Sequence, residues 1–147
     1  MKKILLAFTL VASLLACSSD SDNEETSITK SPITIEYLTK CMFWYYSPDG
    51  GLSKAQLADG AECYSFTRIV NVLSGAYQKD NSVEPKQYTY TVSAPNVMLT
   101  YKDGTKETLV VYRLDKPNDA GFSYLEINGK QFVGSMNGVD TETWKWK

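Results

Sequence analysis

Chemistry in this chain would have to come from carboxylates, hydroxyls and thiols, because its 147 residues include no histidine. A Ser-His-Asp or Cys-His catalytic site cannot be built without that side chain, and neither can a histidine-ligated zinc site. Cys41 and Cys63 do not match the closely spaced cysteine pairs of zinc sites, and no glycine-rich phosphate loop joins a strand pattern to a helix. We therefore expect no catalytic residue, metal ion or cofactor, and we predict that the chain is not an enzyme.

Carboxylates alone could serve a glycosidase if two of them faced one glycosidic bond. Glu126 lies in a strand pattern between two apolar residues, so its side chain is expected to point to water. The following aspartates lie beside glycine or at loop ends, where solvated turn residues are expected: Asp49, Asp59, Asp103 and Asp140. The carboxylates therefore predict no site.

The third cysteine, Cys17, follows an uncharged run at positions 4–16 that begins after Lys2 and Lys3. This run is shorter than the roughly 20 apolar residues of a membrane-spanning helix and is typical of a signal peptide. Leu-Leu-Ala-Cys at positions 14–17 resembles the lipobox of bacterial lipoproteins, in which the cysteine is lipidated and the bond before it is cut. The resemblance implies a signal peptide at 1–16 and attachment to the lipid bilayer through acylated Cys17. The alternative is an ordinary secretory signal with an incidental cysteine.

Residues 17–30 are predicted to form a disordered acidic tether, because positions 18–25 carry only serine, asparagine and acidic residues. Serine and acidic residues directly after a lipidated cysteine resemble the export signal of Bacteroidetes surface lipoproteins. The resemblance implies an outer-membrane lipoprotein exposed at the cell surface. The alternative location is the periplasmic face of the outer membrane.

Residues 31–147 are of a size that fits one domain with its own hydrophobic core. With 15 basic and 17 acidic residues the formal charge is 15 − 17 = −2, and no basic cluster is present, which argues against a nucleic-acid partner. Ten tyrosines, five phenylalanines and three tryptophans favour β-structure, since aromatic side chains suit a pleated surface.

Strand patterns recur along this domain at short intervals. Residues 31–38 fit either a short helix capped at Ser31 or a strand, and 74–85 is predicted to be a polar connection. The predicted strands are 41–46, an alternating stretch within 61–73, 88–93, 97–101, 108–114, 122–127, 131–136 and 141–147. The clearest hairpin signal is Asp103-Gly104, which lies between two alternating runs. About eight antiparallel strands with hairpin turns predict an all-β, up-and-down barrel, with a β-sandwich as the alternative.

The strand layout from residue 41 onward resembles the lipocalin-like domains of small Bacteroidetes lipoproteins. The residues that carry this resemblance are Trp44, Cys63-Tyr64-Ser65-Phe66, Tyr88-Thr89-Tyr90-Thr91-Val92 and Val97-Met98-Leu99. A lipocalin-like barrel implies a mouth that holds one small apolar or aromatic ligand.

The candidate ligand-binding residues are those expected to face the interior of such a barrel: Trp44, Tyr64, Phe66, Arg68, Tyr90 and Tyr112. Arg68 is included because a charge on an apolar face needs a partner. The alternative for the aromatics is plain core packing, since side chains alone can fill a barrel of this size. A rival function is a surface module that binds a glycan or a protein through Tyr45, Trp144 and Trp146.

With Cys17 lipidated, Cys41 and Cys63 remain as a pair in an oxidising compartment. A disulfide between them would close a loop of about 22 residues and contribute roughly 3 kcal/mol. The alternative is two buried free thiols.

Overall fold

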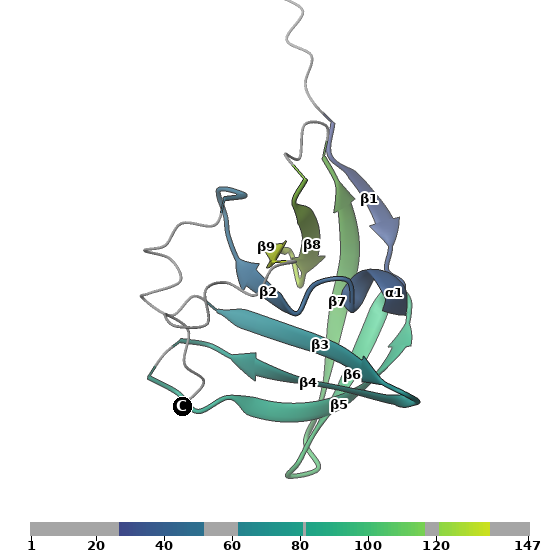
Figure 1. Ribbon diagram of the computed structural model, residues 1–147, viewed down its shortest axis with the longest axis vertical. Helices are drawn as coiled ribbons and strands as arrows, with labels where there is room; N and C mark the ends of the chain where they lie inside the picture. The colour runs from purple at the N-terminus through teal and green to yellow at the C-terminus, as the bar shows by residue number, and fades with distance from the viewer. Residues whose placement is uncertain (1–26, 52–61, 81, 117–120, 136–147) are drawn as a thin grey trace, which may run out of the picture.

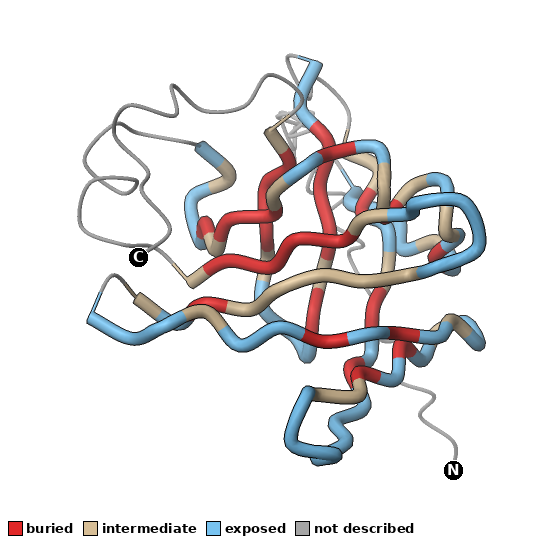
Figure 2. The backbone as a smooth tube through the Cα atoms, turned by 60° about the horizontal axis from the view of Figure 1, so that its bottom comes forward, coloured by how far each residue is buried: buried red, intermediate tan, exposed pale blue. Residues whose placement is uncertain are grey.

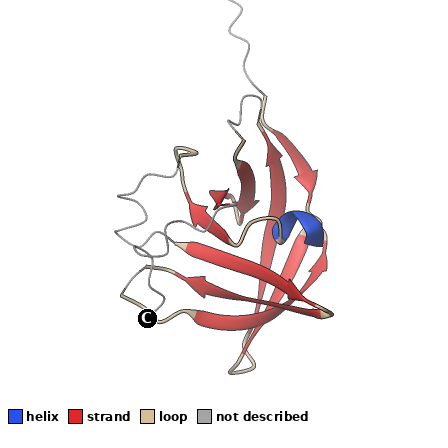
Figure 3. Cartoon of the chain, in the orientation of Figure 1, coloured by secondary structure: helices blue, strands red, loops and turns tan. Residues whose placement is uncertain are grey.

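A computed structural model describes residues 27–51, 62–80, 82–116 and 121–135 of the chain. Within these ranges almost all of the regular structure is β, with a single short helix (Figure 3). The elements are β1 (Thr29–Pro32), α1 (Ile35–Leu38), β2 (Phe43–Tyr46), β3 (Cys63–Ile69), β4 (Val72–Gln78), β5 (Lys86–Ser93), β6 (Asn96–Tyr101), β7 (Lys106–Asp115), β8 (Ser123–Ile127) and β9 (Lys130–Ser135).

Strands β2 to β9 form a closed antiparallel barrel (Figure 1). Each strand pairs with the strands that precede and follow it in the chain, and β9 closes the barrel by pairing with β2. The ninth strand, β1, lies outside the meander and pairs with residues 112–115 of β7, beyond the part of β7 that pairs with β6. The predicted up-and-down barrel of eight strands is therefore confirmed, and the closed sheet excludes the sandwich.

The hairpin turn predicted at Asp103-Gly104 is present, and Asn128-Gly129 forms a second turn of this kind. Gly104 has φ 84°, and the Asp103 carboxylate accepts a hydrogen bond from the Thr105 amide at 2.8 Å. Asn128 and Gly129 both have positive φ, 50° and 79°, as the tight turn between β8 and β9 requires.

The predicted polar connection at 74–85 is wrong in its first half, because β4 occupies residues 72–78. The alternating stretch within 61–73 is in fact the first strand of a hairpin, whose two-residue turn is Val70-Asn71. Val70 has φ 55°, which is unusual for a β-branched residue and gave no turn signal in the sequence. Strand β4 supplies the eighth barrel strand in place of 141–147, which lies outside the described residues.

The predicted inward face of β7 is also wrong. Both alternating sets of this strand contain large apolar residues, so the sequence pattern does not decide between them. The pairing with β6 decides which set faces the interior, because Leu109 lies opposite the buried Val97. Leu109 and Val111 are both fully buried. Tyr112 therefore lies on the outer wall, half-buried, with the Lys30 ammonium 5.9 Å from its ring centroid.

Residues 31–38 contain both a strand end and a short helix, the two structures expected as alternatives. Ser31 and Pro32 end β1, and α1 begins after Thr34, whose hydroxyl accepts a hydrogen bond from the Tyr37 amide as an N-cap. Helix α1 lies against one end of the barrel (Figure 1), and Leu38 is fully buried there in the same core as the barrel interior. We call this end the closed end; the opposite end, which carries the β4–β5, β6–β7 and β8–β9 connections, is the open end.

The core is continuous from the closed end through the middle of the barrel. Figure 2 shows that the buried segments lie in the central parts of the strands, whereas the connecting turns are exposed. Two glycines make room for the large rings. A Cβ atom at Gly75 would meet the Tyr88 ring at 2.7–2.8 Å, and one at Gly134 would meet the Trp44 ring at 2.8 Å.

The predicted lipidation site Cys17, most of the tether, Asp59, Asp140, Trp144 and Trp146 lie outside the described residues.

Candidate functional site

Trp44 belongs to the packing of the closed end. Its side chain is fully buried, and its indole N–H donates to the Leu38 carbonyl at 2.9 Å. The ring stacks on Tyr37 with centroids 5.8 Å apart, and the Arg113 guanidinium lies 4.8 Å from the Tyr37 centroid on the barrel side. All polar atoms of Trp44 are thus satisfied within the protein, and the helix covers it.

Three further predicted site residues meet in the middle of the barrel, where they fill it. Phe66 and Tyr90 pack edge to face at 5.2 Å, and Tyr64 packs against Phe132 at 5.5 Å and stacks beside Phe66 at 6.0 Å. The Tyr90 hydroxyl donates to the Thr67 carbonyl at 3.3 Å. The alternative of core packing describes these aromatics better than a deep ligand cavity does.

Arg68 and Tyr112 lie away from the aromatic cluster in the middle of the barrel. Arg68 is half exposed near the β3–β4 turn and lies 3.8 Å from the Glu36 carboxylate of α1. It is therefore a residue of the closed rim. Tyr112 lies on the outer wall, as described above.

Cys41 and Cys63 are buried free thiols, so the disulfide is not formed. The two side chains belong to different faces of the barrel wall. Cys41 is part of the interior core, whereas Cys63 is on the outward-facing set of β3, opposite Tyr45 of β2. Burial raises the pKa of both thiols, which keeps them protonated.

Polar side chains collect at the open end, where the inward-facing positions of the strands reach solvent. Alternation along the paired strands brings these residues to one rim: Tyr46, Glu62, Tyr77, Lys86, Tyr101, Glu107 and Lys130. Sequence reasoning missed them because β4 was not predicted and because charges at strand ends were assigned to loops. The signal was available in the period of two, since Lys86 continues the inward series of Tyr88 and Tyr90.

Two tyrosine–glutamate pairs shape this rim. The Tyr101 hydroxyl donates to the Glu107 carboxylate at 2.6 Å, and the Tyr77 hydroxyl donates to the Glu62 carboxylate at 3.2 Å. Burial and the Glu62 carboxylate raise the pKa of Tyr77 to about 12, and burial and Glu107 raise the pKa of Tyr101 still further. Both phenols are consequently neutral hydrogen-bond donors at physiological pH.

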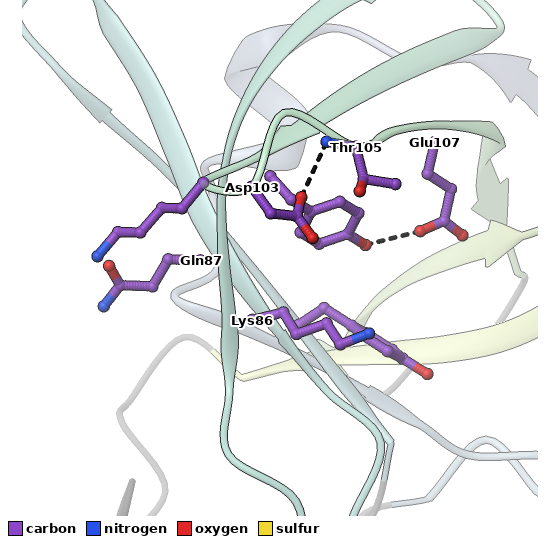
Figure 4. A pocket seen from close by; sticks show the side chains of 8 residues that line it. Lys86, Gln87, Asp103, Thr105 and Glu107 are labelled. Atoms are coloured by element: carbon purple, nitrogen blue, oxygen red, sulfur yellow. Dashed lines mark hydrogen bonds between the residues drawn. The ribbon is translucent and has the colours of Figure 1, made fainter.

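A hollow of about 590 Å³ opens beside these pairs (Figure 4). The Tyr77 and Tyr101 rings give it apolar walls, and Lys86 and Glu107 contribute opposite charges. Its remaining lining comes from the β5 start and the β6–β7 turn: Gln87, Lys102, Asp103 and Thr105. The volume falls within the few hundred to 1,000 Å³ typical of small-molecule sites.

The outer wall carries two shallower depressions of about 540 and 420 Å³. They share Ser65, Thr67, Ala76 and Gln87, and the smaller one is bordered by Met42 and Phe43. Ser65, Thr67 and Gln87 give both depressions polar groups, and the larger one shares Gln87, Tyr101 and Lys102 with the hollow at the open end.

Comparison of the chain with protein-family models, with curated proteins and with solved structures finds no match. Within the described ranges, no helix has the length and apolar character needed to cross a membrane. The same ranges contain no group of three or more acidic, cysteine or histidine side chains arranged to hold a metal ion.

Proposed function

We propose that this chain is a membrane-anchored bacterial lipoprotein whose lipocalin-like barrel binds a small apolar or aromatic ligand at its open end. The observation that carries the binding proposal is the hollow of about 590 Å³ between the Tyr77 and Tyr101 rings. The filled interior beneath it limits the ligand to the mouth, because Tyr64, Phe66 and Phe132 occupy the space below.

The test uses a neutral aromatic probe, N-phenyl-1-naphthylamine, whose fluorescence rises in apolar sites. Tyr101→Ala removes one wall of the hollow and is expected to weaken binding by about tenfold or more, equivalent to about 1.4 kcal/mol. Tyr112→Ala is the matched control, since it removes the same side chain from the outer wall. Absence of probe binding to the wild-type chain, or equal weakening by both variants, would overturn the proposal.

The anchor proposal depends on Leu14-Leu15-Ala16-Cys17 and the preceding apolar run. Two acyl chains are needed for stable attachment, since one gives only marginal membrane binding. Metabolic labelling of the full chain in a bacterial host with an alkyne fatty acid should mark the wild type and leave Cys17→Ala unmarked. Protease accessibility of intact cells then separates the proposed surface location from the periplasmic face.

A second candidate function is a glycan- or protein-binding module, which the two depressions on the outer wall, with Ser65, Thr67 and Gln87 in both linings, favour. Thr67→Trp would block both depressions and leave the open end unchanged. If that variant loses a partner retained on the wild-type chain while probe binding persists, the outer wall is the working surface.

A further inference from the structure

The polar groups of the open end leave a particular set of hydrogen-bonding positions unused. Glu62 is fully engaged, because its two oxygens accept from the Tyr77 hydroxyl at 3.2 Å and from the Lys130 ammonium at 2.8 Å. Glu107 is not, since among the described residues only its Oε2 atom has a donor, the Tyr101 hydroxyl. One carboxylate oxygen of Glu107 is therefore available to a ligand.

Lys86 provides an opposite charge in the same hollow. Among the residues that the structure describes, neither Lys86 nor Glu107 forms an ion pair. Asp103, the other carboxylate of the lining, is held by the turn through its hydrogen bond from the Thr105 amide. Figure 4 shows the Lys86 and Glu107 side chains extending toward the same open space.

Tyr64 adds an unused donor below that space. Its side chain is only 5% exposed, yet its hydroxyl has no hydrogen-bond partner among the described residues. Its ring centroid lies 4.6 Å from that of Tyr77, which lines the hollow, so the Tyr64 phenol lies beside the wall of that space. A nearly buried hydroxyl without a partner is uncommon, and a ligand oxygen would satisfy it.

We propose that the open end binds a small aromatic zwitterion, an amino-acid-like molecule with an ammonium and a carboxylate group. This inference rests on the proposed function and specifies its ligand class. Glu107 accepts a hydrogen bond from the ligand ammonium, with its orientation fixed by Tyr101. Lys86 and the Tyr64 hydroxyl donate to the ligand carboxylate, and the apolar body lies between the Tyr77 and Tyr101 rings.

A single charge on the ligand would satisfy only half of this arrangement. A simple amine would leave Lys86 facing its positive charge, and a simple acid would leave Glu107 facing its negative charge. A neutral apolar ligand would leave both unpaired next to an apolar surface. Only a ligand with both charges pairs Lys86 and Glu107 at the same time, so each charge should add to affinity.

The test is isothermal titration of the purified full chain with three probes of one size: L-phenylalanine, phenethylamine and 3-phenylpropionate. Phenylalanine is expected to bind about tenfold or more tightly than either analogue, because each analogue loses one charge-assisted pairing. Glu107→Gln should remove the advantage over 3-phenylpropionate alone. Lys86→Gln should remove the advantage over phenethylamine alone.

Two control variants carry the same chemical changes away from the hollow. Glu36→Gln alters a carboxylate at the closed end, and Lys106→Gln alters a lysine of β7 that faces outward. Both should keep the wild-type order of affinities.

Equal affinities for the three probes, or no binding of any of them, would overturn the zwitterion proposal. So would wild-type discrimination in Glu107→Gln and Lys86→Gln. The neutral naphthylamine probe separates this failure from failure of the proposed function. If that probe binds through Tyr101 while phenylalanine shows no preference, the open end binds aromatic ligands of another class; if neither binds, the proposed function fails as well.

Discussion

The two ends of the barrel are both rich in aromatic side chains, yet they differ in whether their polar atoms have partners. At the closed end, the Trp44 indole and the Tyr37 hydroxyl each have backbone partners, at 2.9 Å to Leu38 and at 3.3 Å to Tyr124. At the open end, among the described residues, the Tyr64 hydroxyl has no hydrogen-bond partner, and Lys86 and Glu107 form no ion pair.

This difference separates aromatics that serve packing from those next to the hollow where we propose that a ligand binds. Burial and ring contacts do not separate them, since Trp44 and Tyr64 are both at most 5% exposed. Hydrogen bonding of the polar atoms does, because an unpaired polar group is costly in an apolar core, whereas a binding site keeps such groups for its ligand. Changes at the closed end should therefore alter stability, and changes at the open end should alter binding.

The largest effect is expected for Trp44→Ala at the closed end. Removing a fully buried tryptophan costs about 3–5 kcal/mol of unfolding free energy, from lost burial and the cavity that remains. Urea unfolding followed by circular dichroism measures the loss, with Tyr112→Ala as the outer-wall control. A loss under about 1 kcal/mol would mean that the closed end is not the packed core described above.

Gly75→Ala tests the close packing of the middle of the barrel. The added Cβ would meet the Tyr88 ring at 2.7–2.8 Å and the Ser65 carbonyl more closely still, so the strands must shift. Overpacking of this kind costs about 1–3 kcal/mol. Gly51→Ala is the matched control, since apart from its chain neighbours no described atom lies within 4 Å of its Cβ position. Thermal unfolding of the two variants should differ accordingly. Equal stability would show that space remains beside Tyr88.

Tyr101→Phe changes only one hydroxyl at the open end. The hydrogen bond to Glu107 is near solvent, so we expect unfolding free energy to fall by less than about 1 kcal/mol. Binding of L-phenylalanine should weaken nevertheless, because Glu107 loses the group that orients it. A larger loss of stability than of affinity would assign this hydrogen bond to the fold.

One effect appears only in alkaline solution and is absent at neutral pH. Burial raises the pKa of Tyr90 to about 12 from the ordinary value of 10. The folded state thus holds a proton that the unfolded state releases, and this contribution to stability is complete below pH 10 and is lost as pH rises toward 12. Tyr90→Phe should flatten the fall of unfolding free energy between pH 10 and 12, measured by urea titration at several pH values. An unchanged slope would place the Tyr90 hydroxyl in water.

The fold class was predictable because turn residues and alternation agree along most of the chain. Asp103-Gly104 and Asn128-Gly129 specify turns through glycine at positive φ, and Tyr88 and Tyr90 alternate with threonines. The prediction failed at Val70-Asn71, where the turn is made without glycine or proline, and at β7, where both faces are apolar. In both places pairing with neighbouring strands decides the structure, and single-strand patterns do not contain that information.

Only the kind of side chain in the candidate site, inward-facing aromatics, was predictable from the sequence. Trp44, Tyr64, Phe66 and Tyr90 do face the interior, as expected. Which of them are covered and which lie near the hollow depends on how close each residue is to the strand ends at the open rim. The open rim joins residues that are far apart in the chain, such as Glu62 and Lys130, at 2.8 Å. Such pairs follow from barrel closure, which no local pattern encodes.

The most direct test of the account is a ¹H–¹⁵N NMR titration of the full chain with N-phenyl-1-naphthylamine. If the ligand lies at the mouth above a filled interior, the largest shift changes will fall on Tyr77, Lys86, Tyr101 and Glu107. The Trp44 indole N–H, bonded to Leu38 beneath α1, will remain in place. Large changes at Trp44, Leu109 and Val111 with a silent open rim would instead mean that the ligand enters the barrel interior, and would contradict the account.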